Sequence, residues 1–462
     1  MSFEALGEEV LLRIFCFCDI YTVLTLSAIN KALRRIALAK QLWLSLVLDA
    51  MSRDALKLPP PNREKLEYLS TPELIAAVKN AVAGPGSLWD SAPDESSSLT
   101  MTTVRIPLDG MEHRPEARLL PGARYLLLHS TSTTQDTLYL YDVWSARRVW
   151  YHLMLPCKMC EVDLVPGGAI ARVCFVQWAV HPNTHTLHVE EVDLTTGASH
   201  ELFNFSLGSI VFAATPRAIV GDFLLVSVQH SRFINAKLVL INWRASTFVS
   251  LNRNGLYYIQ LIPGYILSTY QETSPPHGHI LAATALEAFS DRWQMLTDNG
   301  AGLAAQLEAG FSSTIMINNL NITTQERLEY SGRPIRFESV AVTPDALHVD
   351  AYDISVYGSH FCQSPPPPRS VTLMERIGNL MNITARRGEA LPVPIQVLPG
   401  ARVLLLYRFT PGQGQAGSKF RLMSARVSNA LPLEFPRAIP SHSGNSISVV
   451  YRQRKGPGAD AA

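Results

Sequence analysis

Apolar side chains recur at intervals of three and four along residues 6–18, which is the period of one helix face. The positions that share this spacing are Leu6, Val10, Leu11, Ile14, Phe15 and Cys18. A second helix is expected from Thr22, which is placed as its N-cap. A third is expected around Leu33, Ile36 and Ala37. The pattern predicts three short helices joined by tight breaks and closed by Leu42 and Trp43.

The next segment is punctuated by strong helix breakers. Pro59-Pro60-Pro61 interrupts any continuing helix. Thr71-Pro72-Glu73 is a good helix start, because it offers a cap, an early proline and an early acid. Gly84-Pro85-Gly86 then ends that helix. We interpret residues 51–100 as a helical connector that sets the distance between the N-terminal helices and the part of the chain that follows.

From about residue 101 the pattern changes to short β-rich runs separated by turns. A turn followed by an apolar strand recurs with Gly at positions 122, 167, 221, 264 and 400. A second marker is a strand that ends in Asp142, Asp193 or Asn242, each followed by a turn and another strand. Most steps between these markers are roughly 45 to 50 residues, the length of a propeller blade, and the step from Gly264 to Gly400 is close to three such lengths.

Units of this length cannot bury both faces alone, so they are expected to stack. We predict a multidomain chain that is α first and then all-β: a small three-helix unit at 1–50, the connector at 51–100, and a large irregular β-propeller at 101–455. Residues 456–462 are expected to be a disordered tail. The β part would hold seven units, with six or eight as alternatives. A pair of β-sandwiches or other stacked sheets is the competing architecture.

The first 43 residues resemble an F-box, the module by which substrate receptors dock onto the Skp adaptor of cullin-based ubiquitin ligases. The resemblance covers about a tenth of the chain. Gly7 stands where the F-box pattern has Pro. The matching positions are Leu6, Glu9, Val10, Leu11, Ile14, Phe15, Leu24, Leu26, Ser27, Lys31, Arg34, Arg35, Leu42 and Trp43.

This resemblance implies a non-catalytic substrate-recognition subunit of a Skp–cullin–F-box ligase, with no catalytic residues and no cofactor of its own. Its partners would be the Skp adaptor, the cullin core and a target protein that the β part binds. The alternatives are a β-propeller enzyme, such as a hydrolase or lyase, or a ligase-independent interaction scaffold. The residues that the resemblance assigns to adaptor binding are Leu6, Val10, Leu11, Ile14, Phe15, Leu24, Leu26, Leu42 and Trp43.

Composition adds little that is specific. The net charge is +1, with 40 basic and 39 acidic residues among 462, so bulk charge gives no reason to expect nucleic acid or a membrane surface as a partner. Six cysteines and an acidic start without a basic n-region favour a cytoplasmic or nuclear location.

The search for metal or redox chemistry gives no site. Cys157 and Cys160 form the only CxxC, without a second ligand pair at zinc spacing, so no metal site is predicted. His181, His185 and His188 flank a turn and are interpreted as surface loop histidines. Strand alternation would send His185 and His188 to opposite faces.

Overall fold

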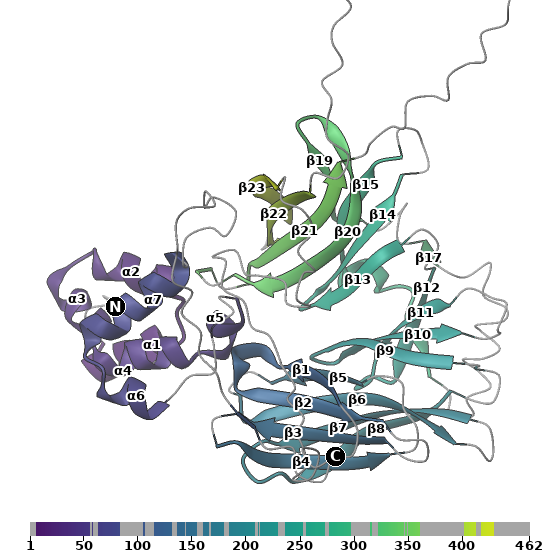
Figure 1. Ribbon diagram of the computed structural model, residues 1–462, viewed down its shortest axis with the longest axis horizontal. Helices are drawn as coiled ribbons and strands as arrows, with labels where there is room; N and C mark the ends of the chain where they lie inside the picture. Colours follow the sequence, from purple (N-terminus) through teal and green to yellow (C-terminus); the bar gives the residue numbers. More distant parts are fainter. Residues whose placement is uncertain are drawn as a thin grey trace, which may run out of the picture.

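The computed structural model describes residues 6–83, 105–106, 115–296, 315–316, 322–360 and 402–428, with short gaps inside these ranges. A bundle of helices comes first, and a series of antiparallel sheets follows it (Figure 1). The expected tail at 456–462 and the Gly400 turn lie outside the described residues.

The N-terminal unit is larger than the three helices expected. It contains α1 (Glu8–Cys16), α2 (Ile20–Ser27), α3 (Lys31–Ala37), α4 (Lys40–Leu48), α6 (Arg63–Tyr68) and α7 (Thr71–Ala83). Leu42 and Trp43 lie inside α4 and do not simply close the third helix. The N-cap of α2 is Asp19, whose carboxylate accepts a hydrogen bond from the Thr22 N–H at 2.5 Å, so the prediction that Thr22 caps this helix is wrong.

Part of the expected connector belongs to the helical core. Leu74 and Val78 of α7 are buried in the same cluster as Phe15, Leu42 and Trp43. Helix α7 begins at Thr71, which was expected as its cap; the capping contacts come instead from Ser70, whose N–H and hydroxyl both donate to the Glu73 carboxylate. The local sequence pattern predicted this helix. It did not predict that the helix packs against α4, because that contact joins residues distant in sequence.

The strands form consecutive antiparallel sheets. Sheet 1 contains β1 (Glu116–Leu119), β2 (Tyr125–Ser130), β3 (Asp136–Asp142) and β4 (Arg147–Met154), and sheet 2 contains β5 (Cys160–Leu164), β6 (Ile170–Ala179), β7 (Thr184–Asp193) and β8 (Ser199–Ser206). Sheet 3 contains β9 (Ala213–Val220), β10 (Phe223–Gln229), β11 (Lys237–Asn242) and β12 (Thr247–Asn252), with β16 (Gln294–Met295) and β17 (Ile315–Met316) paired to β12.

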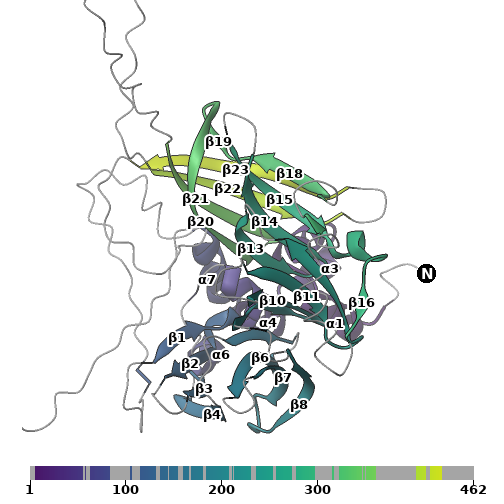
Figure 2. The same cartoon turned by 90° about the vertical axis from the view of Figure 1, so that its right-hand side faces the viewer.

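Sheet 4 contains β13 (Leu256–Ile262), β14 (Tyr265–Gln271), β15 (His279–Ala285) and β18 (Thr324–Arg327). Sheet 5 contains β19 (Glu329–Tyr330), β20 (Arg333–Pro344), β21 (Tyr352–His360), β22 (Arg402–Thr410) and β23 (Lys419–Ser428). The described residues therefore hold five sheets, which follow one another around an arc (Figures 1 and 2).

Each sheet shares an apolar core with the next one. Alternate residues of β6 show this arrangement, because Phe175 packs toward sheet 1 while Cys174 packs toward sheet 3. Further clusters join sheet 3 to sheet 4 around Leu240 and Ile266, and sheet 4 to sheet 5 around Leu267 and Ile354. Sheets stacked face to face around an arc are the arrangement of propeller blades. The predicted fold class, a helical part followed by a β-propeller-like part, is confirmed.

The two sequence markers fall at equivalent hairpins. The turns at Gly122, Gly221 and Gly264 join the first and second strands of sheets 1, 3 and 4. Asp142, Asp193 and Asn242 end the third strands of sheets 1, 2 and 3. In contrast, the strand that follows the Gly400 marker, β22, is not the second strand of a sheet but pairs with β21 and β23 inside sheet 5.

Candidate protein-interaction surface

Helix α1 has one buried face and one exposed face. Leu11 and Phe15 point into the helical core and are 4% and 0% exposed. Val10 and Ile14 lie four residues apart on the other face and are 48% and 37% exposed. Side chains at this spacing are neighbours on a helix surface. Helix α1 therefore presents an apolar stripe that the described helices leave uncovered.

Large apolar side chains are also exposed in the break after α1 and on α2. Phe17 is 87% exposed, which is unusual for a phenylalanine. On α2, Tyr21 and Leu24 are exposed while Ile20 and Val23 are buried. We define the apolar face as Leu6, Val10, Ile14, Phe17, Tyr21 and Leu24. Several large apolar side chains exposed on consecutive elements are a feature of sites of protein association, whereas single exposed ones are common on any protein.

The buried half of the unit fixes the geometry of the apolar face. The indole N–H of Trp43 donates to the Ala37 carbonyl at 2.7 Å, which ties α4 to the end of α3. The Asn30 side chain accepts from the Leu33 N–H at 2.8 Å and caps α3. Because Leu42 and Trp43 are almost fully buried, they hold α1 and α2 in place and are not exposed for binding.

Charged side chains also lie on α1 and α3, the helices next to the apolar positions. Glu8 and Glu9 lie in the first turn of α1, and the Glu8 carboxylate is 2.7 Å from the Arg35 guanidinium of α3. Both partners are exposed, so this pair contributes little to stability. Burial raises the pKa of the Cys18 thiol, with smaller contributions from Asp19 and Cys16. Cys18 is therefore kept in its neutral form beside the stripe.

The nine residues that the F-box resemblance assigns to adaptor binding separate into two groups. Leu6, Val10, Ile14 and Leu24 are exposed, and Leu26 is partly buried against the core. Leu11, Phe15, Leu42 and Trp43 lie in the core. Sequence reasoning missed Phe17 and Tyr21, which are the most exposed members of the apolar face, although their place beside the Cys18-Asp19 break was a signal for them.

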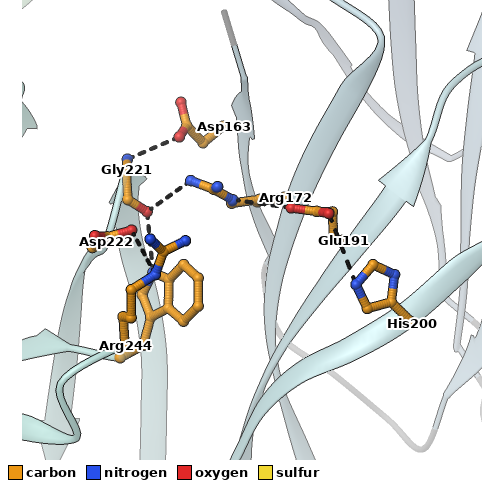
Figure 3. A network of polar contacts seen from close by, with 8 residues as sticks. Asp163, Arg172, Glu191, His200, Gly221, Asp222 and Arg244 are labelled. Carbon is orange, nitrogen blue, oxygen red and sulfur yellow. Dashed lines mark hydrogen bonds and ion pairs between the residues drawn. The ribbon is translucent and has the colours of Figure 1, made fainter.

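A polar network joins sheets 2 and 3 (Figure 3). The Gly221 N–H donates to the Asp163 carboxylate at 2.9 Å, and its carbonyl accepts from the Trp243 indole at 3.1 Å and from Arg172 at 3.4 Å. Arg172 also pairs with Glu191 at 3.5 Å. Burial raises the pKa of Asp163, against the Gly221 hydrogen bond and the charge of Arg172. Asp163 and Arg172 of sheet 2 both contact the Gly221 backbone of sheet 3, so the network ties the two sheets together.

The histidines that were interpreted as surface loop residues include two that lie on a strand. His185 and His188 belong to β7, and the partly buried His188 ring stacks on Phe175 with centroids 5.2 Å apart. The His188 Nδ1 atom is 2.9 Å from Glu201, and His152 of β4 is 3.3 Å from Glu190. His181 and Cys157 lie outside the described residues. Among those described, no group of three or more His, Cys, Asp or Glu side chains is arranged to hold a metal ion.

Helix length and composition also bear on membrane association. Within the described ranges, no helix combines the length and apolar character needed to cross a bilayer.

Comparison with known proteins does not identify a family. No protein-family model and no curated protein matches this chain. Among solved structures, it is similar to hydrazine synthase of Kuenenia stuttgartiensis, with 10% identity, coverage of 65% of this chain and 62% of that one, and a TM-score of 0.28. It is also similar to the β-propeller domain of the Trilobed protease of Pyrococcus furiosus, with 8% identity, 66% and 78% coverage, and a TM-score of 0.27.

The WD40 domain of SCAP from fission yeast gives 11% identity, 68% and 77% coverage, and a TM-score of 0.23. The match thus spans less than two thirds of the hydrazine synthase chain. Since TM-scores at this level carry no argument, the fold assignment depends on the strand pairing and shared cores of this chain.

Proposed function

We propose that this chain is a non-catalytic substrate receptor of a Skp–cullin–F-box ubiquitin ligase. In this proposal the apolar face of α1 and α2 docks the Skp adaptor. The observation that carries the proposal is that the F-box-like positions Val10, Ile14 and Leu24 are apolar and exposed, while the intervening positions build a core. An F-box must combine both properties within some 40 residues.

The β part would bind the target protein. A series of stacked sheets exposes many strand ends and connecting loops, which is where binding residues are usually found. The receptor would accelerate ubiquitin transfer by proximity, since tethering raises the effective concentration of target lysines near the ubiquitin-loaded enzyme. No residue of this chain is then required to take part in bond making.

Co-purification with a Skp adaptor tests the docking step. The informative variant is Val10→Asp with Ile14→Asp, because both side chains are exposed and the substitutions leave the core intact. Tyr68→Asp is the matched control, since Tyr68 is an exposed aromatic residue on α6 of the same unit, outside the apolar face.

We expect the wild type and the Tyr68→Asp protein to retain the adaptor and the cullin, and the double variant to lose both while keeping its circular dichroism spectrum. A wild-type chain that fails to retain the adaptor would refute the proposal. Retention by the folded double variant would show that a different surface binds.

A further inference from the structure

The first and last of the described sheets lack the kind of contact that joins all the others. Sheets 1 to 5 are linked in order by shared apolar cores, but among the described residues no core cluster joins sheet 5 back to sheet 1. A stacked arrangement with two unjoined ends is easily opened, because each sheet is supported mainly by its neighbours.

Helix α5 (Ala50–Ala55) lies in that gap (Figure 1). It packs on one side against η2 (Pro121–Ala123), the turn between β1 and β2, and on the other side against β20 of sheet 5. Helix α5 thus contacts two parts of the β domain that are more than 200 residues apart in sequence. Helix α5 therefore reaches both ends of the described series.

The contact with sheet 1 is a close approach of two backbones. Gly122 has φ +80°, and a Cβ placed on it would lie 2.8 Å from both Cα and Cβ of Ala50. Gly264 occupies the equivalent turn of sheet 4 with φ +75°, yet a Cβ there would meet nothing within 4 Å. The two turns have the same backbone requirement, and only the Gly122 turn is pressed against a helix.

Helix α5 is firmly attached to the rest of the helical unit. The Asp49 carboxylate accepts from the Ser52 N–H at 2.8 Å and caps the helix. The Arg53 side chain is buried, and its guanidinium donates to the Val47 carbonyl at the end of α4 at 3.0 Å. Helix α5 therefore connects η2 to α4 and to the helical core.

A second contact reaches sheet 5 through the loop between β20 and β21. Leu347 packs against the helical core, and the His348 ring stacks on Tyr21 with centroids 5.2 Å apart. Asp345 stabilises this loop, because it accepts from the Leu347 N–H at 2.7 Å and lies 2.5 Å from the Arg408 guanidinium of β22. The loop is thus a fixed part of sheet 5 that touches α2.

From these contacts we propose that the helical unit closes the β domain, joining sheet 1 through α5 and sheet 5 through α5, Leu347 and Tyr21. We call this arrangement the clasp: the distance between sheet 1 and sheet 5 depends on the helical unit staying packed against both. This inference does not require an adaptor to bind the apolar face. With the clasp in place, residues 6–83 and the sheets move together as one rigid body.

The distance between the end sheets tests the clasp. Spectroscopic labels would be introduced through non-canonical amino acids at exposed positions 151 on β4 and 422 on β23 of the full-length chain, and the distance distribution measured by pulsed electron resonance. Gly122→Ala is the test variant and Gly264→Ala is the control, because both strain a left-handed turn but only the first is forced against Ala50.

We expect one narrow distance for the wild type and for Gly264→Ala. Gly122→Ala should raise the ratio of open to closed molecules about tenfold or more, in line with the usual effect of overpacking a tight contact. An unchanged distribution in a folded Gly122→Ala protein would overturn the proposal.

A milder variant covers the case in which Gly122→Ala fails to fold. Leu347→Ala weakens the contact from the sheet 5 side and leaves the sheet 1 turn untouched. It should also broaden the same distance, in the same direction. A sharp, wild-type distribution for Leu347→Ala would count against a clasp formed by the helices.

Discussion

Val10 and Leu11 are adjacent on α1 but differ in what they contact. Leu11 is buried in the helical core, whereas Val10 is exposed. We expect Leu11→Ala to lower the free energy of unfolding of the helical unit by about 2–4 kcal/mol, and Val10→Ala by about 0.5 kcal/mol or less. Urea denaturation monitored by helical circular dichroism would compare them, and equal losses would show that the two faces of α1 are assigned incorrectly.

Asp353 is the residue whose titration should affect stability most plainly. Burial and the nearby Asp345 raise its pKa to about 6, against the charge of Arg408. A carboxyl whose pKa is raised by folding contributes stability below its unfolded pKa of about 4, and this stability is lost as pH rises through about 6. Ionised Asp353 therefore destabilises the fold at neutral pH.

Asp353→Asn removes that ionisation. We expect the variant to be more stable than the wild type at pH 7.5, by up to about 2 kcal/mol, and the difference to shrink toward pH 4. Thermal unfolding at several pH values would measure this. A variant that is less stable at pH 7.5 would mean that the attraction between Asp353 and Arg408, whose charged atoms are 3.6 Å apart, outweighs the burial of the charge.

At the scale of elements, α7 was located by its sequence, but its packing in the helical core was not anticipated. Thr71-Pro72-Glu73 and Gly84-Pro85-Gly86 are local signals that located the helix, although it begins at Thr71 itself and the capping contacts come from Ser70, one residue earlier. That Leu74 would pack with Leu42 depends on how the chain folds back, which no local pattern encodes. The same limit applies to the F-box-like motif. The spacing of its apolar residues does not indicate which of them are buried in the core and which are exposed.

Leu74→Ala tests the new assignment of α7. Leu74 is fully buried, so the substitution should destabilise the helical unit by about 2–4 kcal/mol, whereas Lys79→Ala on the exposed side of the same helix should be nearly neutral. Hydrogen exchange in α1 and α2 provides the measurement. A connector without a packing role predicts no change in either variant.

At the scale of the whole molecule, the sequence markers fall in sheets 1 to 4 because the main strands of each follow one another in the chain, and the turns at Gly122, Gly221 and Gly264 in sheets 1, 3 and 4 have a left-handed φ. The pairing within sheet 5 was not anticipated, because residues 361–401 separate β21 from β22 in the sequence and the two strands do not follow the 45-residue spacing. The contact of α5 with both ends of the series could not be predicted either, since it depends on the closure of the arc.

Removing residues 1–45 should therefore affect the β part as well. The truncation eliminates α1 to α3 and most of α4, uncovers Leu74 and Leu347, and leaves α5 attached to Val47 without the helical core behind it. We expect the truncated chain to aggregate or to unfold at a lower temperature than the full chain, as judged by size-exclusion chromatography and thermal melting. A monodisperse truncated protein with unchanged melting would show that helices and sheets are independent domains.

The central claim is that the apolar face of α1 and α2 docks a Skp adaptor, and titration calorimetry at several temperatures tests it most directly. The account predicts one-to-one binding with a negative heat-capacity change, the mark of apolar burial, and loss of the binding heat in the folded Val10→Asp, Ile14→Asp variant. Absence of binding by the wild type, or equal binding by the double variant, would contradict it.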